Sequence, residues 1–501
     1  MFLIGLDIGT TGCKAILFDE TGAILASASR EYAVDMPHPG WAEQDGEVVW
    51  KLAQECLQTV ATSSTVREVV AIGLSVQGEA IAPSDENGRL LRPMILGMDT
   101  RTAEQNRWLD EKIGAQNLFE RTGMPLHTIN TLPKLLWLKQ NEPELWKVAA
   151  RFLLYEDFLI QKMTGHPAIS RCLASRTQLY DLRQGDWSEE ILQAIGLESS
   201  RLTPVSPSGV AVERMSAGLA KGLGFTNRPF IVTGVHDQAC GALGVGLTTP
   251  GLAMVSTGTA EVVEVALASP TLNQELYRGN LSCYEHVVPE LYLAMTLNHS
   301  GGLLLRWFRD TFCETEREQA QAARLDPYDL ILRHASADPT SLLVLPHFAG
   351  SGTPTFDTSS KGAILGLTFT TNKTDLAKAL LEGLTFELRL NLEVLQRGGV
   401  VIDELRAIGG GARSMQWLQL KADVTGIRVT RPRLTEAAAW GAALLAGHGA
   451  GFFPDLKLAA NQRLHIERSF TPDPGRLRKY NDRYALYQQI YPAVSAIHHQ
   501  M

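Results

Sequence analysis

The sequence Asp7-Ile8-Gly9-Thr10-Thr11-Gly12-Cys13-Lys14, close to the start of the chain, decides the predicted fold. It joins two apolar runs, 2–8 and 14–18, so the pattern predicts a strand, a tight glycine turn and a second strand. A further turn and a third apolar run, within 19–28, complete a predicted three-stranded meander. Backbone N–H groups, two hydroxyls and a lysine at one turn are the groups that bind a phosphate, although a plain β-hairpin is the alternative. Because Mg²⁺ prefers few carboxylates and several waters, Asp7 is a candidate to hold a hydrated Mg²⁺.

A second hairpin of the same kind is predicted near the middle of the chain. The apolar runs 252–255 and 260–265 flank Ser256-Thr257-Gly258-Thr259, so the Gly-Thr pair at 9–10 recurs 249 residues later in a chain of 501. This recurrence predicts a duplicated domain in which each copy opens with a strand, a Gly-Thr turn and a strand. The alternative is coincidence, since Gly-Thr turns are common. Two such hairpins facing each other across a cleft would hold a polyphosphate.

Length and composition indicate a folded protein of two domains. A chain of 501 residues is too long for one compact core, and 45% hydrophobic with 20% charged residues excludes a disordered chain. The formal net charge of -8 shows no basic surplus, so nucleic acid and anionic membranes are not expected partners. Six cysteines without a CxxC pair indicate buried thiols in a reducing compartment.

Two further features favour a cytoplasmic protein without a membrane segment. The N-terminus has no basic segment before its apolar run and carries an acidic residue at position 7, which does not fit a signal peptide. The most apolar stretch, 437–453, is rich in Ala and Gly and too short to span a bilayer, so we expect a buried helix there.

Strands and amphipathic helices alternate along the rest of the chain. Apolar runs at 69–76, 230–235 and 404–407 predict strands. Helices are predicted in both halves, at 47–61, 102–112, 133–141, 155–164, 373–395, 415–425 and 435–446. This mixture predicts an α/β protein whose sheets are covered by helices.

The strand predicted at 230–235 leads into His236, Asp237 and Gln238. Because ligands of open α/β sheets bind at the carboxyl ends of strands, Asp237 is a candidate base for a hydroxyl that attacks a phosphorus atom. A capping aspartate is the alternative. Neighbouring side chains on a strand face opposite ways, so His236 is expected to have a structural role. The motifs of P-loop, dinucleotide-binding, zincin and α/β-hydrolase proteins are absent.

Two more segments carry candidate binding residues. Gly409-Gly410-Gly411 follows a predicted strand and precedes a helix, so its backbone lets a flat ring such as adenine approach closely. A flexible turn would be equally rich in glycine. Strand alternation continued from 69–76 would place Gln77 and Glu79 on one face, where both can bind substrate hydroxyls.

Taken together, these segments resemble the FGGY carbohydrate kinases, which include xylulokinase, gluconokinase and glycerol kinase. The resemblance extends from about residue 3 to about residue 450. It rests on the segments 7–14, 40–45, 99–101, 236–238, 258–259, 300–302, 306–307, 353–354, 362–368, 409–414 and 441–443. It implies two actin-like (ribonuclease-H-like) ATPase domains with a cleft between them. Residues 1–245 would hold the sugar and the catalytic base, and residues 246–501 would bind the nucleotide.

The resemblance also implies a role for each candidate residue. Asp237 would be the catalytic base and, with Asp7, would place Mg²⁺. The implied phosphate-binding residues are Thr10, Thr11, Lys14, Gly258 and Thr259. The implied nucleotide-binding residues are Gly302, Gly410, Gly411, Ala412 and Met415. The implied substrate-binding residues are Gln77, Gly78, Glu79, Asp99 and Gln238. The implied cofactors are ATP and Mg²⁺, the implied partner is a small sugar or polyol, and a homodimer is one open arrangement.

The sequence departs from the family mainly where the family selects its sugar. Gly78-Glu79 stands where xylulokinases usually have Met-His and glycerol kinases Arg-Glu, and Gly97 stands where many members have Trp. A usual Asp is missing near Leu173. The missing large side chains predict a roomy polar pocket, unless the loop 126–131 refills it. The whole-chain pattern favours a pentulose kinase. Gluconate, hexulose, tetritol and glycerol kinases, and a non-catalytic sugar or nucleotide sensor, are the alternatives.

Overall fold

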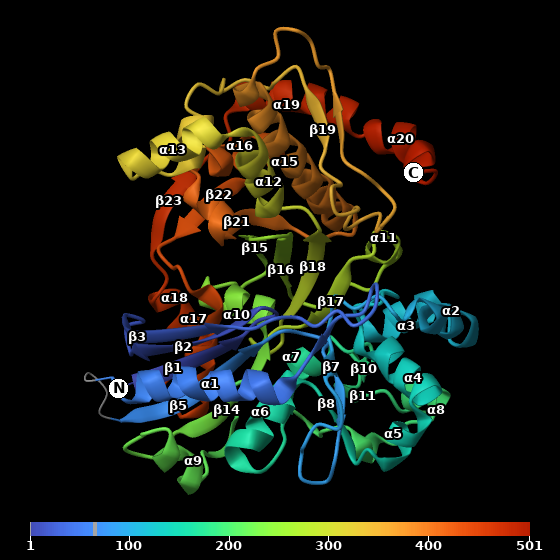
Figure 1. The fold of residues 1–501 in the computed structure, drawn as a ribbon, viewed down its shortest axis with the longest axis vertical. Coiled ribbons are helices and arrows are strands. Elements are labelled where there is room, and N and C mark those ends of the chain that lie inside the picture. Colours follow the sequence, from blue (N-terminus) through green and yellow to red (C-terminus); the bar gives the residue numbers. More distant parts are fainter. Residues whose placement is uncertain (1, 64–67) are drawn as a thin grey trace.

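The computed structural model describes residues 2–63 and 68–501, which form two α/β lobes, one above the other in Figure 1. The lower lobe contains a six-stranded sheet in the order β13-β14-β5-β1-β2-β3. Its strands are β1 (Phe2–Ile8), β2 (Gly12–Asp19), β3 (Ile24–Glu31), β5 (Val69–Val76), β13 (Ala211–Arg214) and β14 (Phe230–His236). β1 and β2 pair antiparallel, as do β2 and β3, whereas β1, β5 and β14 run parallel. The predicted meander is therefore confirmed.

The upper lobe repeats this connectivity in a seven-stranded sheet, β17-β18-β16-β15-β21-β22-β23. Its strands are β15 (Gly251–Thr257), β16 (Glu261–Leu267), β17 (Ser282–Glu285), β18 (Tyr292–Asn298), β21 (Ile402–Ile408), β22 (Arg428–Pro432) and β23 (Ile466–Phe470). β15 pairs antiparallel with β16 and parallel with β21, β16 pairs antiparallel with β18, and β21 runs parallel to β22. The strands from β18 to β23 thus repeat the order of the first sheet, and β17 is an additional edge strand. This shared order confirms the predicted duplication.

Helices cover both sheets, as the alternating sequence pattern predicted. In the first half they are α1 (Gly46–Ala61), α2 (Ala103–Lys112), α3 (Ala115–Thr122), α4 (Thr131–Asn141), α5 (Pro143–Val148), α6 (Tyr155–Thr164), α7 (Arg171–Ala174), α8 (Glu189–Ile195), α9 (Ala217–Gly222) and α10 (Asp237–Gly244). In the second half they are α11 (Gln274–Arg278), α12 (Gly302–Phe312), α13 (Glu314–Ala323), α14 (Pro327–Ile331), α15 (Lys373–Arg397), α16 (Met415–Thr425), α17 (Ala437–Gly449), α18 (Leu456–Gln462), α19 (Pro474–Tyr487) and α20 (Ile490–His498).

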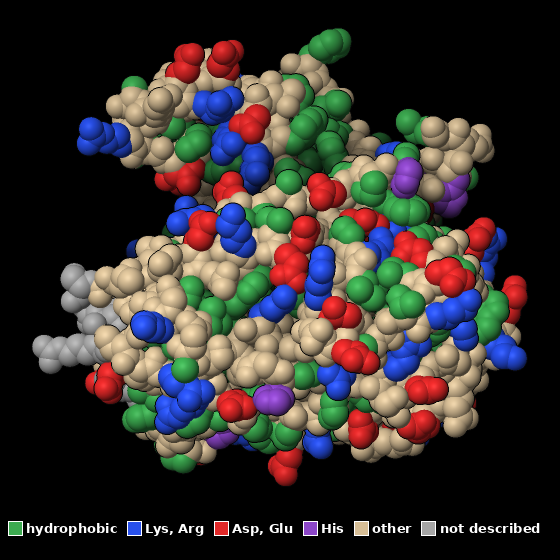
Figure 2. All heavy atoms as spheres, turned by 60° about the horizontal axis from the view of Figure 1, so that its bottom comes forward, with side chains coloured by type: hydrophobic (Ala, Val, Ile, Leu, Met, Phe, Trp, Pro, Cys, Tyr) green, Lys and Arg blue, Asp and Glu red, His purple; other side chains and the backbone are tan. Residues whose placement is uncertain are grey.

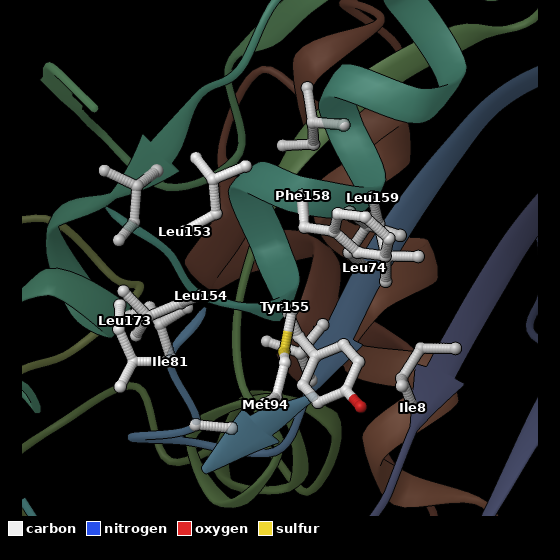
Figure 3. Close-up of a cluster of buried hydrophobic side chains, with 14 of the residues drawn as sticks. Ile8, Leu74, Ile81, Met94, Leu153, Leu154, Tyr155, Phe158, Leu159 and Leu173 are labelled. Atoms are coloured by element: carbon white, nitrogen blue, oxygen red, sulfur yellow. The ribbon is translucent and has the colours of Figure 1, made fainter. Parts of the chain in front are cut away.

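Apolar side chains bury both faces of the first sheet. Figure 3 shows Tyr155 and Phe158 of α6 beside Leu74 of β5 and Ile8 of β1, all of them fully buried. On the other face, Leu3 belongs to a second buried cluster that includes α17. Strands buried on both faces need near-continuous apolar sequence, which explains the apolar runs of β1 and β5.

Helices α10 and α17 pack against each other between the two lobes. Although α17 comes from the second half of the chain, it also packs on β1 and β5 of the first sheet. The packing is so close that a Cβ on Gly73 would lie 2.0 Å from the carbonyl oxygen of Ala442, and a Cβ on Gly441 would lie 2.0 Å from that of Cys240. The buried helix predicted within 437–453 is therefore confirmed for residues 437–449, whereas Gly451 and Phe452 beyond its end are exposed. Through its contact with α10, this helix joins the two halves of the chain.

The charged surface, the lengths of the helices and the cysteines add three observations. On the face shown in Figure 2, Lys and Arg side chains are interspersed with Asp and Glu and form no basic patch. Among the residues that the structure describes, no helix has the length and apolar character needed to cross a membrane. All six cysteines are buried as free thiols.

Candidate active site

The first glycine hairpin is held from behind by polar side chains. Tyr32 donates its hydroxyl to the carbonyl oxygen of Gly9 at 2.7 Å, and Gln44 donates its amide to that of Thr10 at 2.9 Å. Gln77 donates to the carbonyl oxygen of Gly9 at 3.3 Å and to Gln44 at 3.0 Å. The carbonyl oxygens of Gly9 and Thr10 are therefore both held by side chains of the first lobe.

Lys14 follows this hairpin and contacts the other half of the chain. Its Nζ donates to both carboxylate oxygens of Glu436 at 2.9 Å. Glu436 is the N-cap residue of α17 and Asp237 is the first residue of α10, so an acidic residue lies at the N-terminal end of each helix. The predicted phosphate ligand Lys14 is thus paired with a carboxylate, and a phosphate at this turn would have to share or replace that pair.

The second glycine hairpin joins β15 to β16 and is also fixed by a buried charge. Lys421 of α16 donates to Glu261 at 2.5 Å and to the Thr257 hydroxyl at 2.8 Å, and both ionic side chains are almost fully buried. Helix α12 begins at this turn, where the N–H of Gly302 donates to the carbonyl of Gly258 at 2.8 Å. Any side chain at residue 302 would collide, because a Cβ there would lie 2.7 Å from that carbonyl oxygen. The N–H groups of Gly302 and Leu303 both donate to carbonyl oxygens of this turn, so the start of α12 holds the turn in place.

A cavity of about 720 Å³ opens beside the second hairpin. Its volume lies in the range of small-molecule sites. Its lining includes Gly258, Thr259, Gly302, Arg306, Tyr328, Leu332, Leu381, Gly410, Gly411, Ser414 and Trp417. Predicted residues from three distant segments therefore meet in one place. Ala412 and Met415 do not line the cavity, because Ala412 is buried in the core and Met415 packs against the core beneath the second sheet.

Asp237 lies where β14 ends and α10 begins. Its side chain is 31% exposed, so a ligand can reach the carboxylate. Burial among protein atoms and, to a lesser extent, the nearby charge of Asp7 raise the pKa of Asp237 to about 7. His236 is buried, its Nε2 lies 3.3 Å from Oδ1 of Asp237, and burial lowers its pKa to about 3, so the ring is neutral at pH 7.

Asp7 and Asp237 together fit a hydrated magnesium ion. Asp7 accepts a hydrogen bond from Ser75 at 2.5 Å, and burial raises its pKa. Burial and mutual repulsion both disfavour the ionised forms of these two neighbouring carboxylates. A cation between them would stabilise their negative charges. Mg²⁺ usually takes one or two carboxylates and keeps several waters, which agrees with this pair.

The prediction that strand alternation places Gln77 and Glu79 on one face is wrong. β5 ends at Val76, and Glu79 has a φ of 59°, so both residues lie in the loop after the strand and strand alternation does not apply. Gln77 faces the first hairpin, whereas Glu79 is buried and its Oε1 accepts hydrogen bonds from Arg176 at 2.8 and 2.5 Å. The two side chains therefore have different surroundings.

The prediction of a roomy pocket is wrong at Gly78, and at Gly97 the free space is smaller than predicted. A Cβ on Gly78 would lie 2.7 Å from the ring of His236, so the imidazole occupies the space that a larger side chain would need. A Cβ on Gly97 would lie 3.5 Å from Ile129 and 3.7 Å from Oε2 of Glu79. The loop 126–131 thus lies against Gly97, which agrees with the alternative that this loop refills the space left by the missing Trp.

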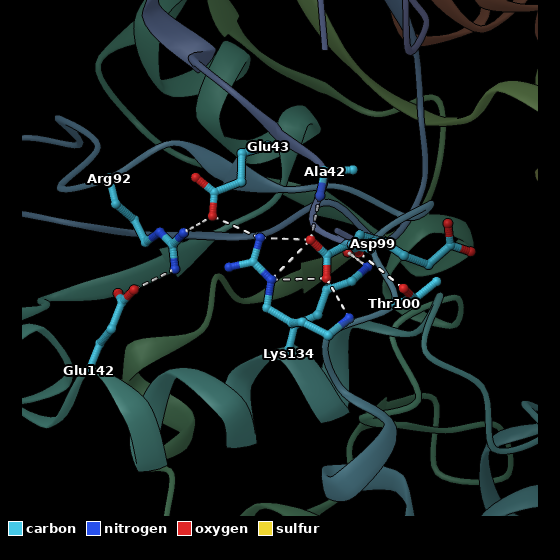
Figure 4. Close-up of polar contacts among 10 residues, drawn as sticks. Ala42, Glu43, Arg92, Asp99, Thr100, Lys134 and Glu142 are labelled. Atoms are coloured by element: carbon cyan, nitrogen blue, oxygen red, sulfur yellow. Dashed lines mark hydrogen bonds and ion pairs between the residues drawn. The ribbon is translucent and has the colours of Figure 1, made fainter. Parts of the chain in front are cut away.

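Asp99 is fully buried and belongs to a charged network (Figure 4). Its carboxylate accepts hydrogen bonds from the backbone and side chain of Arg101 and from the N–H of Ala42 at 2.6 Å. Arg101 also pairs with Glu43 at 2.7 Å. Asp99 therefore ties the segment of Ala42 to the segment of Arg101. Gln238, the last predicted substrate residue, follows Asp237 in α10, and its Oε1 is buried without a hydrogen-bond partner among the described residues.

Both halves of the chain match known protein domains. Residues 2–244 match the N-terminal domain of the FGGY family of carbohydrate kinases, and residues 253–450 match its C-terminal domain. The chain belongs to the FGGY family of carbohydrate kinases. This FGGY kinase is 30% identical over 507 residues to the xylulose kinase of Lactococcus lactis subsp. lactis, with 100% of this chain and 98% of the relative covered. It is 31% identical over 504 residues to the xylulose kinase of Escherichia coli strain K12, with 98% and 100% covered.

The fold of the FGGY kinase also agrees with a solved structure. The crystal structure of a xyloylose kinase from Brucella ovis superposes with a TM-score of 0.89 and 29% sequence identity, covering 99% of this chain and 100% of that chain. The two-domain α/β fold predicted from the sequence is therefore confirmed, as is an ATP-dependent carbohydrate kinase.

Several residues around the FGGY kinase site escaped the sequence analysis. They include Tyr32, Gln44, Arg176, Tyr328, Lys421 and Glu436. Gln44 lies inside the segment 40–45 that carried the resemblance, so its position was available as a signal. The others act through contacts between residues far apart in the chain, and no local pattern marks them.

Proposed function

We propose that this kinase transfers the γ-phosphoryl group of ATP to a hydroxyl of a pentulose, with Asp237 as the base. The observation that carries the proposal is the reachable Asp237 carboxylate, whose pKa is raised to about 7, at the end of β14. The sugar is inferred from the xylulose kinases that resemble the chain over almost its whole length.

The proposed reaction follows from the position of the charged groups. The sugar hydroxyl donates its proton to the Asp237 carboxylate as its oxygen bonds to the γ-phosphorus, and the bond from that phosphorus to the β–γ bridging oxygen breaks. Catalysis of this kind depends on positioning and charge stabilisation. Thr10, Thr11 and Lys14 would contact the phosphates from one side, and Gly258 and Thr259 from the other. Mg²⁺, held through water by Asp7 and Asp237, would neutralise the phosphate charge.

We propose the same division of labour between the halves of the chain. Residues 1–245 would provide the sugar site and the base, and residues 246–501 the nucleotide site. The cavity beside Gly302, Gly410 and Gly411 supports the second assignment. A cytoplasmic location is proposed from the ATP requirement and the free thiols, and a homodimer stays a prediction.

The carboxylate of Glu79 favours an uncharged sugar over an aldonate. It is buried, and although burial is the largest single influence and raises its pKa, the charge and hydrogen bonds of Arg176 together with the charge of Lys134 and other nearby groups lower it overall. The carboxylate therefore carries a negative charge at pH 7. Such a group accepts a hydroxyl proton readily but repels a substrate carboxylate. A panel of sugars assayed for ADP release tests the proposal. We expect the highest kcat/KM for a pentulose, and a higher value for gluconate or glycerol would overturn the choice of sugar.

Activity is expected to fall on acidification. Asp237 accepts a proton only when ionised, and its raised pKa means that the protonated form persists up to about pH 7. The value of kcat/KM for the sugar should therefore fall about tenfold per unit below that pH and level off above it. A pH–rate profile at saturating ATP checks this, and a flat profile between about pH 5.5 and 8 would contradict it.

Filling the space at Gly97 is expected to shift the preference toward short substrates. An indole at residue 97 would occupy the space beside Ile129 and Glu79 Oε2. We expect Gly97→Trp to lower kcat/KM for a pentulose by about 10–200-fold, the range for lost fit in a pocket, and to affect glycerol less. The control is Gly97→Ala, whose methyl group meets only ordinary contact distances. Equal losses for both substrates would argue against a role in size selection.

A further inference from the structure

Arg176 is a buried arginine that no part of the proposed reaction uses. It follows α7 and is only 2% exposed. Both Nε and Nη2 donate to the same oxygen of Glu79, Oε1, at 2.8 and 2.5 Å. A buried charged group is retained at a cost in free energy unless its partners are well placed, so the geometry of this pair needs an explanation.

The other side of the guanidinium contacts the second lobe. Nη1 donates to the hydroxyl of Ser282 at 3.0 Å, and the group lies 4.7 Å from the ring centre of Tyr284. Both residues belong to β17, and the Tyr284 hydroxyl in turn donates to Glu264 of β16 at 2.7 Å. Arg176 therefore connects Glu79 in the first lobe to the sheet of the second lobe.

Glu79 is fixed at every point except one oxygen. Its carbonyl oxygen accepts hydrogen bonds from the Thr131 hydroxyl and from Nζ of Lys134, each at 3.1 Å. Its Oε1 is held by Arg176. No residue that the structure describes donates a hydrogen bond to its Oε2, which faces the space at Gly97. The held carboxylate thus leaves one acceptor atom on the side of Gly97, in the region where the resemblance places the selection of the sugar.

We propose that Arg176 is a positioning residue that orients Oε2 of Glu79 to accept a sugar hydroxyl, and that β17 of the second lobe completes this arrangement through Ser282. The proposal rests on the proposed sugar-kinase function. Arg176 does not touch the sugar. It restricts rotation of the glutamate, so that the acceptor is in place before the sugar binds. The second lobe therefore contributes to sugar binding as well as to nucleotide binding.

Two single variants test the proposal by separating sugar binding from nucleotide binding. Ser282→Ala removes the bond between the lobes and leaves the Arg176–Glu79 pair in place, so we expect KM for the pentulose to rise about 2–10-fold. Arg176→Lys keeps the charge but loses the two-pronged contact, so a rise of about 10–100-fold is expected. In both variants KM for ATP should stay within about twofold, since that site lies beside β15 and α12. Arg121→Lys, which alters an ion pair of the same lobe with Glu190, is the control and should change neither KM.

A double-mutant cycle distinguishes positioning from general structural support. If Arg176 acts through Glu79, adding Arg176→Lys to Glu79→Gln should raise KM for the sugar no further than Glu79→Gln alone. Additive effects would overturn the proposal, as would an unchanged KM for the sugar in Ser282→Ala and Arg176→Lys. Should Arg176→Lys fail to fold, Ser282→Ala decides the question by itself. An inactive wild-type protein on every sugar would instead overturn the proposed function and this inference with it.

Discussion

Replacement of Asp237 by Asn is expected to lower kcat for phosphoryl transfer by roughly 10²–10⁴-fold while ATP still binds. Asn has the same shape but cannot take the proton of the attacking hydroxyl. Asp237 does not line the cavity beside the second hairpin, so loss of its charge leaves the proposed adenine site unaltered. Steady-state kcat with the preferred sugar and calorimetric binding of ATP measure the two quantities separately.

The matched control for this variant is Asp482→Asn. Asp482 is an exposed carboxylate on α19, far along the chain from the site, and its loss should leave kcat unchanged. Retention by Asp237→Asn of more than about a tenth of wild-type kcat would show that Asp237 is not the base. Loss of ATP binding together with kcat would indicate a structural role for the residue.

Replacement of Gly441 by Val is expected to destabilise the whole protein. A Cβ at this position would lie 2.0 Å from the carbonyl oxygen of Cys240, where backbone rather than a flexible side chain would have to move. Inserting atoms into packed cores typically lowers the free energy of unfolding by about 1–3 kcal/mol. Because the Val side chain would collide with backbone, we expect a loss of about 3 kcal/mol or more. Because α10 begins at Asp237, displacement of α10 should lower activity as well.

Denaturant unfolding of Gly441→Val beside Gly218→Ala measures this effect. Gly218 lies in α9, where a Cβ would meet no atom within 4 Å. Alanine is the better helix former, so the control should be stabilised by roughly 0.5–1 kcal/mol. A Gly441→Val protein with wild-type stability would show that α10 and α17 can separate without cost, contrary to the packing described above.

Local sequence patterns predicted most of the fold because its elements depend on neighbouring residues. The hairpin at Gly9–Gly12 follows from glycines between two apolar runs, and α6 has the bounds that its periodicity predicted. The repeat needed only the Gly-Thr recurrence to be suspected, and the shared strand order of the two sheets explains it. The same logic placed Asp237 at the end of an apolar strand.

The surroundings of the candidate sugar site could not be predicted in this way. The space above Gly78 depends on His236, which is distant in the chain, and Glu79 depends on Arg176 for its orientation. Glu79 also has a positive φ, which does not occur in a β-strand, so the alternation of side chains along a strand could not predict its orientation. Contacts of this kind are set by tertiary packing, so a missing side chain in the sequence does not by itself show an empty space.

Phosphorus NMR of the complete reaction tests the central claim most directly. With ATP, Mg²⁺ and D-xylulose, we expect the γ-phosphate signal to be replaced by one sugar-phosphate monoester signal in step with ADP, and only when both enzyme and sugar are present. Formation of ADP with inorganic phosphate and no sugar phosphate would contradict a kinase that uses Asp237 to activate a sugar hydroxyl. An unchanged ATP spectrum with every sugar of the panel would favour a protein that binds sugar or nucleotide without transferring phosphate.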